Sequence, residues 1–244
     1  MALRPGRGDQ DTLKLTVDSP QWAVGSLLLA AMLLVGCSGG PPPADWKMNA
    51  VSLLENTQKR WLEGDTGAAE LALAKTRTEI ARSGRADLLA RAELAACAAR
   101  VASLDFAPCA AYDKLAADAS AGDGAYARFL AGDWRGLDAK LLPAHYAPLL
   151  GTADDAAANK AVAGIKEPLP RLVAAALLLK TGRADPATLA LAVDTASERG
   201  WRRPLLAWLE VELKRARDAG DSAATGRIQR RIDMVMTSGG KPAP

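Results

Sequence analysis

The residues able to carry out chemistry are few, because the chain of 244 residues contains three cysteines and one histidine. Cys97 and Cys109 are twelve positions apart and flank a predicted turn at 103–108, so an antiparallel helical hairpin would bring the two thiols together. In an oxidising compartment two thiols that meet usually pair, and closing a loop of this size contributes on the order of 2–3 kcal/mol. We predict a Cys97–Cys109 disulfide; free buried thiols are the alternative, and a metal site would lack further ligands.

The familiar arrangements for catalysis are missing from the sequence. His145, in the segment Pro-Ala-His-Tyr-Ala-Pro, has no serine or cysteine nucleophile motif beside it. Asp154 and Asp155 are adjacent, so on a helix their side chains point about 100° apart and do not readily share a substrate. There is no Gly-rich phosphate loop. We expect no catalytic residue, no metal and no cofactor; an enzyme would need a cleft in which polar groups converge on His145.

Composition favours helices over strands. Alanine, the best helix former, supplies 52 of the residues, whereas aromatic residues make up 5%. Strands prefer β-branched and aromatic side chains, so we expect an all-α fold. The 31 basic residues nearly balance the 28 acidic ones, so no strong electrostatic field directs the chain to nucleic acid.

An apolar run of fourteen residues extends from Trp22 to Val35. It spans roughly 21 Å as a helix, short of the ~30 Å hydrocarbon core of a bilayer, and has the length of a signal-peptide core. The run ends in Leu34-Val35-Gly36-Cys37, which resembles the lipobox of bacterial lipoproteins. A buried helix that ends at a free cysteine is the alternative.

The resemblance implies that residues 1–36 are a cleaved signal peptide and that Cys37 becomes the mature N-terminus. In that family the cysteine carries a covalent diacylglycerol and an N-acyl lipid, which together make a stable membrane anchor. Residues 37–44 hold a Gly/Pro-rich stretch that would act as a short tether. Ser38 after the cysteine implies the outer membrane, on its periplasmic face.

Apolar positions recur at intervals of three and four from residue 45 onward, as in amphipathic helices. We expect a single all-helical domain over 45–236 and a disordered tail over 237–244. Asp45 is predicted to cap a first helix that Gly64 ends, and Asp65 to start the next. Further helices are expected over 86–101, 108–119, 123–131, 134–142, 143–150, from about 152, from 168 or 170 to 181, 185–200, 203–219 and 221–236.

A six-residue pattern recurs after 68 residues, twice the length of a tetratricopeptide repeat. The segment Arg-Trp-Leu-Glu-Gly-Asp at 60–65 returns as Arg-Phe-Leu-Ala-Gly-Asp at 128–133. Both segments resemble the turn inside a tetratricopeptide hairpin. The resemblance implies helical hairpins near 46–82 and 126–142 in a tetratricopeptide-like solenoid; an irregular helical bundle is the alternative.

The C-terminal helices are basic, with nine Arg or Lys residues against four Asp or Glu residues between 199 and 231. A solvated helix face is one interpretation; the other is a surface for a protein partner or an anionic polymer, formed by Arg227, Arg230 and Arg231. The expected function is a non-catalytic protein-interaction scaffold or adaptor, anchored through its lipid and facing the periplasm, with an envelope protein as partner. The alternative is a module that binds peptidoglycan or another anionic envelope polymer.

Overall fold

The first described element is an antiparallel helical hairpin. The computed structural model describes residues 44–238, and α2 (Asp45–Glu63) pairs with α3 (Thr66–Ala81). Gly64 adopts a left-handed conformation with φ of 94°, which closes α2. The Asp65 carboxylate then caps α3 by accepting the Ala68 amide at 3.0 Å. The predicted cap of α2 is wrong by one residue, because Ala44 is the extended residue and Asp45 already lies in the first turn.

The recurring six-residue pattern corresponds to a recurring helix end. At 60–65 the amide of Gly64 donates to the carbonyl of Trp61, and at 128–133 the amide of Gly132 donates to that of Phe129. In both segments the following aspartate amide donates to the carbonyl of the arginine that opens the pattern. The two segments therefore form the same C-terminal capping motif.

The second predicted hairpin does not form. After α6 (Ala121–Ala131) the only regular structure before residue 143 is a 3₁₀ turn, Ala139–Leu141, so the helix expected over 134–142 is wrong. Trp134 stacks on Phe129, with ring centroids 5.2 Å apart, and its indole N–H donates to the Phe129 carbonyl at 3.0 Å. These contacts turn the chain back onto α6.

Two other predicted helices are shorter than expected. The segment 108–119 holds α5 (Ala110–Asp113) and a 3₁₀ turn, Ala116–Asp118, and the segment 143–150 holds α7 (Ala147–Leu150). Cys109 is the N-cap of α5, so Pro108 precedes this helix rather than opening it. Segments this short cannot sustain a helix by themselves and take their form from tertiary contacts.

The remaining helices begin and end close to the predicted residues. They are α4 (Ala86–Ala102), α8 (Asp155–Gly164), α9 (Pro168–Lys180), α10 (Pro186–Glu198), α11 (Arg202–Asp218) and α12 (Ser222–Thr237). Asp154, Asp185 and Asp221 cap α8, α10 and α12 with their carboxylates. Because α12 continues to Thr237, the predicted tail begins one residue too early. Residues 1–43 and 239–244, with the predicted signal peptide, Cys37 and most of the tether, lie outside the described residues.

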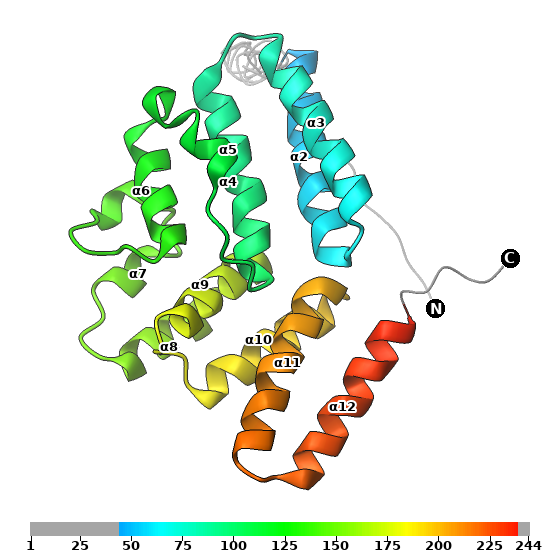
Figure 1. Ribbon diagram of the computed structural model, residues 1–244. Coiled ribbons are helices and arrows are strands. Elements are labelled where there is room, and N and C mark those ends of the chain that lie inside the picture. The colour runs from blue at the N-terminus through cyan, green and yellow to red at the C-terminus, as the bar shows by residue number, and fades with distance from the viewer. Residues whose placement is uncertain (1–43, 239–244) are drawn as a thin grey trace, which may run out of the picture. The chain divides into compact units, whose positions relative to one another are not determined.

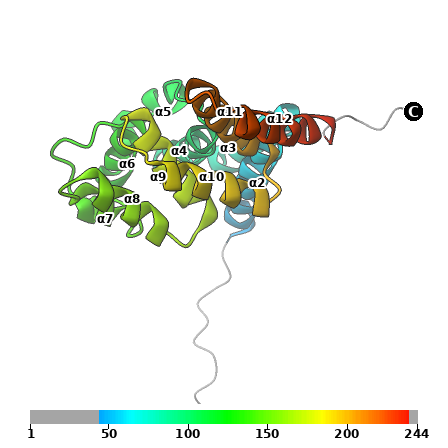
Figure 2. The same cartoon turned by 90° about the horizontal axis from the view of Figure 1, so that it is seen from below.

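The core is centred on α4 and α9, which pack against each other. Figure 1 shows α4 between α6 on one side and the hairpin of α2 and α3 on the other, and α9 packs against α8 and α10. Figure 2 shows the same helices from below. Trp208 of α11 is fully buried, and its indole N–H donates to the Ala102 carbonyl at the end of α4 at 3.2 Å.

Every regular element between residues 44 and 238 is a helix, which confirms the predicted all-α fold. Neighbours in sequence pack as pairs, with the most extensive packing in α2 with α3, α11 with α12, and α10 with α11. None of the helices in this range combines the length and the apolar character needed to span a membrane.

We predict that Leu177→Ala lowers the free energy of unfolding by about 2–5 kcal/mol, because it leaves a cavity in the fully buried face of α9. Urea denaturation followed by circular dichroism measures the change. Leu71→Ala is the matched control: this leucine is 58% exposed, so its loss should change stability by less than about 0.5 kcal/mol. Equal losses in the two variants would contradict the placement of α9 in the core.

Candidate functional site

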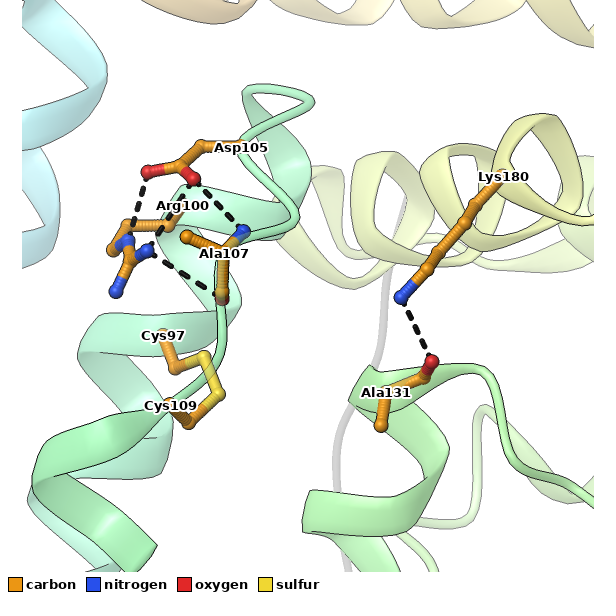
Figure 3. Close-up of a disulfide and its surroundings, with 7 residues drawn as sticks. All are labelled: Cys97, Arg100, Asp105, Ala107, Cys109, Ala131 and Lys180. Atoms are coloured by element: carbon orange, nitrogen blue, oxygen red, sulfur yellow. Dashed lines mark hydrogen bonds and ion pairs between the residues drawn. A yellow bond between two sulfur atoms is a disulfide. The ribbon is translucent and has the colours of Figure 1, made fainter.

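Cys97 and Cys109 form a disulfide, which confirms the prediction made from their spacing. Their Cα atoms are 5.9 Å apart, and the bond joins the last turns of α4 to the start of α5 (Figure 3). Cys97 is buried and Cys109 is half-buried. The bond therefore closes the connection between these two helices.

Polar contacts hold the loop inside the disulfide. Arg100 donates to the Asp105 carboxylate at 2.8 Å and to the Ala107 carbonyl at 3.4 Å, and Asp105 accepts the Ala107 amide at 3.1 Å (Figure 3). The hydrogen bond from Arg100 lowers the pKa of Asp105, against the effect of burial. Lys180 of α9 lies over the Phe106 ring, 5.4 Å from its centroid. The loop is thus held by α4 and α9 as well as by the disulfide.

His145 lies in a cleft of about 460 Å³ between α4, α6 and α9. Burial lowers the pKa of His145, against the attraction of the Glu167 carboxylate, so its imidazole is neutral at neutral pH. Its ring meets the edge of Tyr146, with centroids 4.1 Å apart. Tyr126 lines the same cleft, and burial raises its pKa to about 12. Sequence reasoning identified His145 but none of these neighbours.

The charged groups of this cleft bind each other. Arg91 donates two hydrogen bonds to Asp123, at 3.0 and 3.2 Å, and the Ser120 hydroxyl donates to the same carboxylate at 2.6 Å. Burial raises the pKa of Asp123, but these hydrogen bonds outweigh it and leave the pKa below its usual value. Among the described residues, no hydrogen bond connects His145 to Ser120. The cleft therefore contains an ion pair between Arg91 and Asp123 and the neutral imidazole of His145.

The predicted arginine face lies on α12, the last helix. Arg227 and Arg230 are exposed and Arg231 is half-buried. Within residues 44–238 none of the three forms an ion pair. Arg227 lines a groove of about 520 Å³, and Arg230 and Arg231 are not among the residues that line it.

The groove is made by three helices, and most of its lining was not foreseen. It contains Arg215 of α11 beside Arg227, with a floor and walls formed by Pro186, Leu189, Glu212, Ala216, Ala219, Asp221, Ala224 and Ile228. Burial raises the pKa of Glu212; Arg231 and Arg215 oppose this shift and Asp194 adds to it. The sequence signals for this site were Arg227 and the excess of basic residues between 199 and 231.

Asp154 and Asp155 are not brought together as a paired acid. Asp154 caps α8 by accepting the Ala157 amide at 2.7 Å, and Asp155 pairs with Arg183 at 2.6 Å. In the part of the chain that is described, no group of three or more His, Cys, Asp or Glu side chains is placed to hold a metal ion.

Comparisons of the chain with protein-family models, with curated proteins and with solved structures found no match.

We predict that replacing both Cys97 and Cys109 by serine lowers the free energy of unfolding by about 3 kcal/mol, because the unfolded chain gains the freedom of the opened loop. The measurement is urea denaturation without reductant. Adding reductant should lower the stability of the unmodified protein to that of the variant and leave the variant unchanged. A variant as stable as the oxidised protein would contradict this role of the bond.

We predict that Glu212→Gln stabilises the protein at about pH 7. Burial raises the folded-state pKa of Glu212, so the folded state binds this proton more tightly than the unfolded state, and protonation stabilises the fold as pH falls through that pKa. Glutamine resembles the protonated form of Glu212, so the gain in stability from the substitution should be smaller at about pH 4.5. Denaturation at both pH values tests this, with Glu210→Gln, an exposed position on α11, as control. An equal advantage at both pH values would contradict the assignment.

Proposed function

We propose that the protein is a bacterial lipoprotein anchored through lipidated Cys37 to the periplasmic face of the outer membrane, where it acts as a non-catalytic scaffold for an envelope protein. The observation that carries this proposal is the sequence Leu34-Val35-Gly36-Cys37 at the end of a fourteen-residue apolar run. An apolar run of this length supports export of the chain. Two or more acyl chains on one cysteine would then make the anchor stable.

The Cys97–Cys109 disulfide supports an oxidising location. Disulfides persist in compartments such as the bacterial periplasm and are rare in reducing ones. With these two cysteines paired, Cys37 is the one cysteine of the chain outside a disulfide, and lipidation would account for it. The pairing and the lipobox therefore support the same location from separate parts of the chain.

The packing of the helices supports a scaffold. Paired neighbours such as α2 with α3 and α11 with α12 resemble the hairpins of tetratricopeptide-like solenoids, in which each hairpin contacts mainly its neighbours and leaves long grooved surfaces for partners. The grooves and the cleft described above lie between such helices. Binding of a protein segment, with no chemical step, is the function that these surfaces support best.

The anchor is tested by intact mass and membrane fractionation of the protein from a bacterial host, beside Cys37→Ala. We expect the unmodified protein to begin at a lipid-modified Cys37 and to sediment with membranes, and the variant to lose the lipid mass and the membrane association. The Cys97→Ser, Cys109→Ser double variant is the matched control and should keep both. A protein that retains residues 1–36 and fractionates away from membranes would overturn the proposal.

A further inference from the structure

We infer that the groove between α10, α11 and α12 binds an acidic peptide segment that also carries apolar side chains. This inference rests on the proposed scaffold function and names the chemistry of its partner. The groove is lined by Arg215 and Arg227, and Arg231 lies close enough to Glu212 to oppose the rise of its pKa. We call this site the α10–α12 groove.

Three carboxylates on the helices that carry the arginines of the groove are engaged by other groups. Asp218 accepts from Lys214 at 2.7 Å, Asp221 caps α12 through the Ala224 amide at 2.8 Å, and Asp233 accepts from Gln229 at 3.0 Å. By contrast, Arg215 and Arg227 have no ion pair with any residue in 44–238. A partner carboxylate would complete a charge-assisted, bidentate contact with either guanidinium.

Glu212 is the one carboxylate inside the groove that no hydrogen bond engages among the described residues. Burial raises its pKa, with Asp194 acting in the same direction and Arg231 and Arg215 in the other. It lies on α11, the helix that also carries Arg215, and it lines the groove. Glu212 and Asp221 line the groove together with Arg215 and Arg227, and Arg231 lies near Glu212, so three arginines stand against two carboxylates. The Asp221 carboxylate is held at the start of α12 by the Ala224 amide.

The apolar part of the groove distinguishes a peptide from a polysaccharide or a lipid headgroup. Pro186 of α10, Ala216 and Ala219 of α11 and Ile228 of α12 line the groove, and Leu189 of α10, which is only 2% exposed, lies beneath them in the core. Small alanines leave depth for a side chain, and the surrounding apolar surface gains by covering it. A sugar chain or a phosphate would use the arginines but would not cover the apolar surface that Pro186, Ala219 and Ile228 still expose. An extended or helical peptide with both carboxylates and leucine-like side chains matches both parts.

The position of α12 keeps the groove open. Among the described helices α12 packs extensively against α11 alone, and it lies at the edge of the helical array (Figures 1 and 2). Ile232 is the one residue of α12 that is buried. In the His145 cleft, by comparison, Arg91 and Asp123 neutralise each other, so that cleft does not select a charged ligand.

The test uses the full-length protein and fluorescein-labelled synthetic peptides of alternating Glu and Leu. We expect saturable binding that weakens with added salt. The Arg215→Ala, Arg227→Ala double variant should weaken binding by at least about tenfold, because two charge-assisted contacts are lost. Arg230→Ala is the matched control, since this exposed arginine is on the same helix but does not line the groove; it should change the Kd by less than about twofold. Thermal unfolding verifies that each variant is folded.

Three further peptides or particles separate the groove from a general basic surface. A peptide with Lys in place of Glu should not bind, and one with Ser in place of Leu should bind at least about tenfold more weakly. Vesicles that contain phosphatidylglycerol should not compete with the Glu-Leu peptide. Three outcomes would contradict the groove and favour a polyanion-binding face. They are a loss of peptide affinity in Arg230→Ala equal to that in the double variant, binding of the Glu-Ser peptide as tight as that of the Glu-Leu peptide, and competition by the vesicles.

Failure of this test and failure of the proposed anchor are distinguishable. Absence of peptide binding in a protein that still sediments with membranes through Cys37 would overturn the groove and leave the anchor intact. Peptide binding by an unmodified protein that carries no lipid after isolation from a bacterial host would uphold the groove and overturn the anchor.

Discussion

Helix α9 has to be covered on all sides, and the arrangement of the other helices follows from this. Seven consecutive residues, Leu172–Leu178, are buried, so the helix has no face that water could solvate. A helix that is apolar all round is stable only inside a protein. Accordingly α4, α8 and α10 each pack against it. The alanines at its centre and those on α4 let the two backbones approach closely.

Trp208 connects this core to the C-terminal helices. It carries the largest fully buried side chain, and its indole N–H reaches the carbonyl of Ala102 at the end of α4, 106 positions earlier in the sequence. The same end of α4 carries Cys97 and Arg100, which hold the loop before α5. A single helix end thus joins the core, the disulfide and the hairpin of α11 and α12. A partner bound to the α10–α12 groove would contact a hairpin that is tied directly to the core.

Charged residues are arranged differently in the His145 cleft and in the α10–α12 groove. In the His145 cleft the arginine and the aspartate lie next to each other and form a bidentate pair, so the ionic groups contribute to the structure. In the α10–α12 groove Asp221 is engaged in a helix cap, Glu212 accepts no hydrogen bond from the described residues, and Arg215 and Arg227 remain exposed. The difference lies in the partners of the arginines, since both hollows contain residues of both signs.

Local sequence alone determined where most helices begin and end. Asp65, Asp154, Asp185 and Asp221 cap helices with their own carboxylates, and glycines such as Gly64 and Gly132 end them with a left-handed residue. These are interactions within one turn of backbone, so they can be identified from neighbouring residues. The spacing of Cys97 and Cys109 was equally local, since a short turn brings them together.

Only the tertiary structure decided which short segments stay helical and which residues share a site. The segments at 108–119 and 134–142 have helix-forming residues, yet the first forms only the short α5 and a 3₁₀ turn and the second only a 3₁₀ turn. The disulfide constrains the first segment, and the stacking of Trp134 on Phe129 constrains the second. Most of the other residues that line the cleft of His145 come from helices distant in the sequence, and Arg215 and Arg227 line one groove because α11 and α12 pack against each other. Such contacts depend on how an apolar core is shared among distant segments, and no local pattern encodes that choice.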